Sequence, residues 1–117
     1  MANEITVVAT LKYAKNKAAT QLATSHNADQ SGDKYEGGIQ TVGTVEEQLT
    51  KGDVGVIGYL AVRNTDAVNF VQLGSSAGNY SLKLLAGKGA VIPWSGSAVY
   101  AKADTTAVDV EYLIIEA

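Results

Sequence analysis

The feature that most constrains the fold is a two-residue alternation of apolar and polar side chains, which recurs along the chain. In the final stretch, VDVEYLIIEA, four apolar residues share one face of an extended strand: Val108, Val110, Tyr112 and Ile114. Asp109 and Glu111 share the other face, as the period of a half-buried strand requires. Leu113 and Ile115 then place apolar bulk on that acidic face. Either the protein's own chain or a partner subunit must cover them.

The same period predicts strands elsewhere. Residues 5–13 and 80–84 alternate, and a tight turn at Asn16 would return NKAATQLAT as a further strand. Residues 54–63 are apolar on both faces, as in a central strand that is covered on two sides. No segment of helical length shows a 3.6-residue period. The sequence therefore predicts an all-β fold: an antiparallel, jelly-roll-like β-sandwich of about eight short strands.

Turn residues suggest how these strands pair. We expect RNTDA to return the central strand as a hairpin with residues 67–73, because Asn and Asp favour turns. We likewise expect AGKG to join 80–84 to AVIPW, with SAVYAKA as a later strand. Pro93 cannot donate to a sheet ladder, so its strand should lie at an edge or end near that residue.

Two segments are less regular. TVEEQLTKG, at 44–52, matches a helical capping box through Thr44 and Glu47, but it also alternates well enough for an edge strand, which we favour. SHNADQSGDKYEGG is polar and rich in glycine. It predicts a flexible surface loop around residues 25–38.

Length and composition indicate one domain over residues 1–117. The chain has 117 residues, of which 46% are apolar and 18% charged, and this composition is typical of a globular protein. Cysteine is absent, which excludes disulfides, thiol catalysis and thiolate metal sites. Stability must come from packing, and oligomerisation would add to it.

Charge and hydropathy exclude several kinds of partner. The formal net charge is −3, and the sequence pattern suggests that the basic residues are scattered singly, so we expect no nucleic-acid binding. The N-terminal MANEITVV lacks the positive charge of an export signal. The longest apolar run, VGVIGYLAV, is about half the roughly 20 residues of a membrane-spanning helix, so we expect no membrane partner.

Motifs for chemistry are weak, and we expect no enzyme, cofactor or metal. GSSAG, residues 74–78, fits a nucleophile elbow around Ser76, but that motif needs a following helix and a later histidine. The only histidine, His26, comes earlier, so a hairpin loop is favoured. GKG at Gly87 reads as a turn. One acidic cluster could in principle bind a hard cation, although its spacing does not match a calcium loop: His26, Asp29, Asp33 and Glu36.

Aromatic residues offer one binding alternative. Trp94 and Tyr100 flank SGSAV and could form a platform for a sugar, although such residues more often belong to a core or an interface. Together with Leu113 and Ile115 they are the candidate interface residues.

Two stretches resemble small β-sandwich structural proteins of tailed bacteriophages. They are YEGGIQTVGTVEEQLTKGDVGVIGYLAVRNTDAVNFVQLG and AVYAKADTTAVDVEYLIIEA, so the resemblance covers most of the chain from Tyr35 onward. It implies a capsid decoration or cement protein: a homo-oligomer, commonly a trimer, that is made in the bacterial cytoplasm and binds the major capsid protein on the outer face of the head. Tail or fibre-associated roles belong to the same class. A carbohydrate-binding sandwich module is the alternative outside it.

Overall fold

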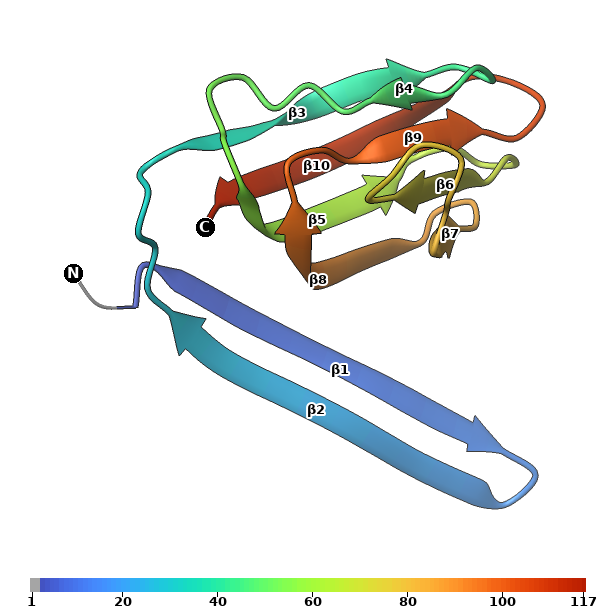
Figure 1. Cartoon of the computed structure of the whole chain (residues 1–117). Helices are drawn as coiled ribbons and strands as arrows, with labels where there is room; N and C mark the ends of the chain where they lie inside the picture. The colour runs from blue at the N-terminus through green and yellow to red at the C-terminus, as the bar shows by residue number, and fades with distance from the viewer. Residues whose placement is uncertain (1–2) are drawn as a thin grey trace. The chain divides into compact units, whose positions relative to one another are not determined.

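The computed structural model describes residues 3–117, and its secondary structure consists of strands without any helix over that range. Over these residues the chain forms ten strands, which are labelled in Figure 1. They are β1 (Ile5–Lys15), β2 (Ala18–Ala28), β3 (Tyr35–Val42), β4 (Glu47–Gln48), β5 (Ile57–Asn64), β6 (Val71–Gly74), β7 (Leu82–Leu84), β8 (Gly89–Gly96), β9 (Tyr100–Ala103) and β10 (Val108–Glu116). The chain divides into two compact units, one ending at Ser31 and the other spanning Gly32–Ala117.

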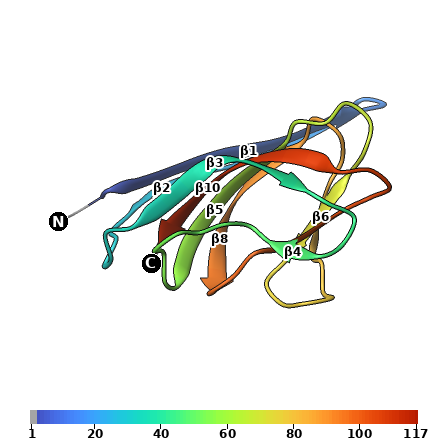
Figure 2. The same cartoon turned by 90° about the horizontal axis from the view of Figure 1, so that it is seen from above.

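The second unit is a jelly-roll β-sandwich. One sheet has the strand order β3-β10-β5-β8, and the other has the order β4-β9-β6-β7 (Figures 1 and 2). All neighbours are antiparallel, and four pairs are nested within one another along the chain: β3 with β10, β4 with β9, β5 with β8, and β6 with β7. Eight strands nested in this way form the two Greek keys of a jelly roll. The predicted fold class is therefore confirmed.

The core lies between the two sheets and follows from the alternation of the strands. On β10 the even-numbered residues from Val108 to Ile114 are buried, and their neighbours Asp109, Glu111 and Leu113 are exposed. Buried residues from every sandwich strand except the two-residue β4 and the half-buried β8 join them in one apolar cluster, and Leu82, Ala90, Ile92 and Trp94 pack against it. Since cysteine is absent, the burial of this cluster is the main source of stability.

One polar side chain lies within this core. Asn64, at the end of β5, is fully buried. Its amide nitrogen donates to the carbonyl oxygens of Asn69 (2.9 Å) and Leu84 (3.0 Å), and its amide oxygen accepts from the Asp66 nitrogen (2.8 Å). These bonds fix the RNTDA segment, which carries the chain from one sheet to the other.

The nested order corrects both predicted hairpins. Residues 67–73 do not return against β5, because β6 belongs to the opposite sheet and pairs with β7 and β9. Residues 80–84 and 90–94 are likewise in different sheets, since β7 pairs with β6 and β8 pairs with β5. In this jelly roll, consecutive strands lie in different sheets except for the β6–β7 hairpin, so closeness in sequence does not in general give the pairing. The edge position expected from Pro93 is confirmed, because β8 ends its sheet.

The first unit contains a long β-hairpin, which we call the arm (β1 and β2, Ile5–Ala28). Its strands pair over their full length, from Ile5 opposite Ala28 to Lys15 opposite Ala18. Asn16 (φ 51°) and Lys17 (φ 72°) form the two-residue turn. Two positive φ values give a turn whose twist suits a hairpin, and asparagine favours it. The tight turn expected at Asn16 is confirmed.

Two boundary predictions are resolved as well. The loop expected at 25–38 is wrong at both ends, because β2 continues to Ala28 and β3 begins at Tyr35. Within 44–52 the structure has the short edge strand β4 and no helix. The strands of the sandwich lie in the compact unit Gly32–Ala117, and the arm lies in the unit that ends at Ser31.

Candidate interaction surface

The outward side of the sheet β3-β10-β5-β8 carries a continuous group of apolar residues, which we call the outer face. Its position follows from alternation, because the inward residues of each strand form the core. The register places its members in two rows across the four strands. One row runs through Tyr35, Ile115, Tyr59 and Pro93, and the next through Gly37, Leu113, Ala61 and Val91.

Several of these side chains are open to solvent. Tyr35 is 73% exposed and Leu113 39%, while Tyr59, Ala61 and Ile115 are half-buried. Ile39, 67% exposed, extends the outer face along β3. Single exposed apolar residues are ordinary, but a contiguous group on one sheet face is typical of an interaction site.

Charged residues border the outer face at one end. Glu111 lies opposite Arg63 and forms an ion pair with it, and Asp109 accepts a hydrogen bond from the Thr41 hydroxyl (2.6 Å). The outer face is therefore apolar toward the C-terminal end of β10 and charged toward its start, where Arg63 balances Glu111 and Asp109 adds a negative charge. Such a gradient can orient a partner as well as bind it.

The sequence-predicted interface residues fall into two groups. Leu113 and Ile115 lie side by side on the outer face, in adjacent rows. Trp94 packs against the core, and its indole nitrogen donates to the Ala98 carbonyl (3.1 Å). Tyr100 lies on β9 of the opposite sheet, next to the buried Ala101. Trp94 and Tyr100 thus belong to different sheets, and they do not form one flat platform.

The GSSAG segment is part of the loop between β6 and β7. Ser76 bridges to Asn79 within it, and the chain continues into a strand instead of the helix that a nucleophile elbow needs. Glu46 holds the loop, accepting hydrogen bonds from the Gly78 nitrogen (2.6 Å) and the Tyr80 hydroxyl. The bond to Glu46 raises the pKa of Tyr80 to about 12. The favoured hairpin loop is confirmed.

The four residues considered for a cation are divided between the units. His26 and Asp29 belong to the arm's unit, and Asp33 and Glu36 to the sandwich. Within residues 3–117, no three His, Cys, Asp or Glu side chains are grouped so that they could hold a metal ion.

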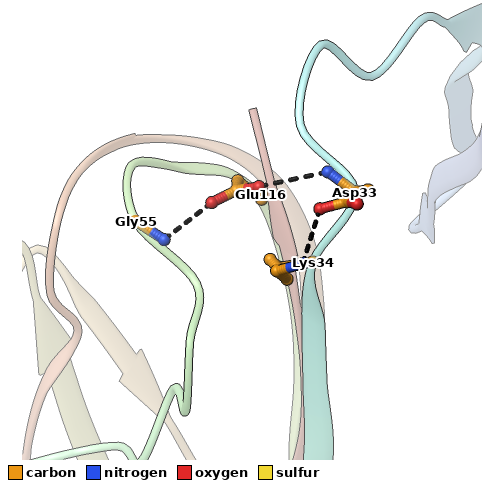
Figure 3. Close-up of polar contacts among 4 residues, drawn as sticks. All are labelled: Asp33, Lys34, Gly55 and Glu116. Carbon is orange, nitrogen blue, oxygen red and sulfur yellow. Dashed lines mark hydrogen bonds and ion pairs between the residues drawn. The ribbon is translucent and has the colours of Figure 1, made fainter.

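Glu116 is the centre of a group of polar contacts in the sandwich, shown in Figure 3. Its carboxylate accepts hydrogen bonds from the backbone nitrogens of Gly55 (2.9 Å) and Asp33 (3.2 Å). Asp33 also pairs with the Lys34 ammonium (2.9 Å). The bond from Gly55 is the main cause that lowers the pKa of Glu116 below its ordinary value of 4.5. The cluster fastens the end of β10 to the start of β3 and to the loop before β5.

This cluster gives a testable pH dependence. A carboxyl whose pKa is lowered by folding stabilises the protein above its ordinary pKa, and that stabilisation is lost as pH falls through the lowered value. We expect Glu116→Gln to be less stable than wild type at pH 7, and the two to converge on acidification below about 4.5. Urea titrations between pH 7 and pH 3 measure this. A difference that stays constant over that range would contradict it.

The arm presents a second apolar surface. Every residue from Thr10 to Asn27 is exposed. Leu11 and Leu22 are opposite each other on one face of the arm, and both are 76% exposed. Tyr13 lies on the same face, whereas Thr10 and Ala23 form the neighbouring pair on the other face. This face therefore carries open apolar side chains from Leu11 toward the turn, whereas Ile5 and Val7 on the same face are buried, and the exposed Val8 lies on the other face.

The arm also carries three basic residues close together, whereas the sequence predicts basic residues that are scattered singly. Lys12, Lys15 and Lys17 lie at or beside its turn, and no acid occurs between Ile5 and Ala28. The signal that could have revealed this basic end is the acid-free run itself.

Comparison of the chain with models of known protein families, with curated proteins and with solved structures finds no match. Over residues 3–117 the structure also has no helix that is long and apolar enough to cross a membrane. The fold and its two apolar surfaces are therefore the features that indicate a function.

Proposed function

We propose that this protein is a non-enzymatic structural component of a tailed-bacteriophage virion, a capsid decoration or cement protein that binds the outside of the head. The observation that carries the proposal is the outer face, a continuous apolar surface on a four-stranded sheet. A protein that works by docking needs such a surface. Jelly rolls are frequent among viral capsid domains, although a fold alone does not give a function.

The geometry also suggests how such a protein would stabilise a shell. A jelly-roll body with apolar surfaces on both the sheet and the arm can contact more than one neighbour. Many identical copies on a head make each modest contact effective, because binding at one point raises the effective concentration at the next. In this proposal the partners are further copies, in a trimer, and the major capsid protein.

A carbohydrate-binding role has less support. Its two aromatic residues, Trp94 and Tyr100, are in different sheets, and Trp94 is packed against the core. A tail or fibre-associated position uses the same surfaces as a head position, and the experiment below separates them.

The test is the location of the protein on particles. Purified virions of the phage that encodes this chain are labelled with a gold-coupled antibody against it. Heads and tails are then purified and analysed separately by mass spectrometry. We expect labelling over the head and recovery of the chain in the head fraction. Its recovery with tails would move the role to the tail, and its absence from purified particles would contradict the proposal.

A further inference from the structure

We propose that the arm of one copy docks, by its apolar face, on the outer face of a second copy of this chain. The inference rests on the proposed structural role and names the partner of the outer face. Its starting point is that the arm has only two strands. A two-stranded hairpin is at best marginally stable in water, and a third strand or a packed apolar face is needed to stabilise it.

The apolar side of the arm suits a sheet surface. Leu11, Leu22 and Tyr13 project from one face of the hairpin, while Thr10 and Ala23 project from the other. Packing one flat apolar face on another removes both from water at about 25 cal/mol per Å² of apolar area. Burying the leucine pair alone therefore favours docking.

The dimensions of the two surfaces agree. Ile5 and Val7, on the same face as Leu11, are buried, so the part of β1 that is open for docking runs from Ala9 to Lys15. At a rise of about 3.4 Å per residue, that part extends over roughly 24 Å, and the two apolar rows of the outer face are only two residues apart along β10. The open part of the arm is thus long enough to cover both rows.

Charge favours a second copy as the partner. The arm carries three lysines and no acid between Ile5 and Ala28, whereas Gly32–Ala117 contains ten acids against six bases. Lys15 shares the apolar face of the arm, and Asp109 borders the apolar part of the outer face. Each additional copy brings one basic arm with open apolar side chains and one apolar sheet face with Asp109 at its border. Opposite charges of this kind orient docking and speed association.

Introduced cysteines test the contact directly, because the chain has none of its own. A Leu22→Cys protein, isotopically labelled, is mixed with an unlabelled Leu113→Cys protein under mild oxidation. We expect a disulfide-linked pair that contains one labelled and one unlabelled chain. The matched control replaces Leu113→Cys by Lys102→Cys, which is exposed on the opposite sheet, and should give little of the mixed pair.

Each other outcome overturns the inference. If the mixture gives no more product than the control, the arm does not dock there. If a chain carrying both Leu22→Cys and Leu113→Cys closes an internal disulfide while the mixture forms none, the arm folds onto its own sandwich. Purified protein alone is used, so these outcomes do not depend on the phage proposal, which stands or falls with the labelling of particles.

A second measurement covers the case in which a cysteine disturbs the arm. We expect Leu11→Ser with Leu22→Ser to lower the native mass by at least twofold, whereas Thr10→Ser with Ala23→Ser, on the other face, leaves it unchanged. The fluorescence of Trp94, the single tryptophan, reports that the sandwich stays folded. An unchanged mass in the leucine variant would overturn the inference.

Discussion

Replacing Asn64 by leucine should destabilise the protein more than any surface change. Leucine preserves much of the volume but leaves the carbonyls of Asn69 and Leu84 and the amide of Asp66 without the partner that Asn64 gives them. Leaving a buried polar group unsatisfied costs about 1–3 kcal/mol. We therefore expect the free energy of unfolding to fall by roughly 3–5 kcal/mol for Asn64→Leu.

Asn64→Asp tests the same hydrogen bonds by introducing a negative charge at the buried position. At pH 7 its carboxylate would still accept from the Asp66 nitrogen but would face two carbonyl oxygens to which it cannot donate. We expect a loss at least as large as for leucine, and partial recovery at acidic pH as the carboxyl protonates. Urea denaturation at both pH values measures it. Asn79→Ala, in an exposed loop, is the control, and an equal effect there would contradict the role of Asn64.

The second large effect on stability is expected on only one of the two faces of β10. Ile114 is fully buried in the core, and its neighbour Leu113 points outward. Truncating a buried isoleucine to alanine costs about 2–5 kcal/mol through lost burial and the cavity that remains. We expect Ile114→Ala to lose that amount, and Leu113→Ala to lose no more than about 1 kcal/mol of the stability of the single chain.

The comparison requires equal protein concentrations, because association contributes to apparent stability. Leu113→Ala should instead weaken assembly, which the concentration dependence of the mass reveals. If both variants unfolded equally easily as single chains, the assignment of the two faces would be wrong.

Much of the fold could be predicted from local pattern. The alternation of β10, the apolar character of 54–63 around β5 and the edge position of Pro93 follow from side chains that meet either core or solvent. The turn at Asn16 follows from the tolerance of asparagine for positive φ.

The pairing of strands could not be predicted in this way. Residues 67–73 follow the central strand closely in sequence, yet the bonds of Asn64 direct the chain to the other sheet. The extent of the arm was missed for a related reason. Ser25, His26 and Asn27 lie on a two-stranded ribbon, where polar residues meet water on both faces and no alternation marks the strand.

Only part of the candidate interaction surface could be predicted from the sequence. Leu113 and Ile115 broke the pattern of β10, and the structure places them among the apolar residues of the outer face. Their neighbours Tyr35, Tyr59 and Val91 come from distant strands, so only the register of the sheet brings them together.

The measurement that tests this account most directly is the native mass of the full chain by light scattering across a range of concentrations. One chain is 12.2 kDa. We expect a small multiple of that mass, with a trimer favoured, and a shift toward the single chain when Leu113→Asp places a charge in the outer face. A wild-type mass of one chain at every concentration would contradict assembly through this surface.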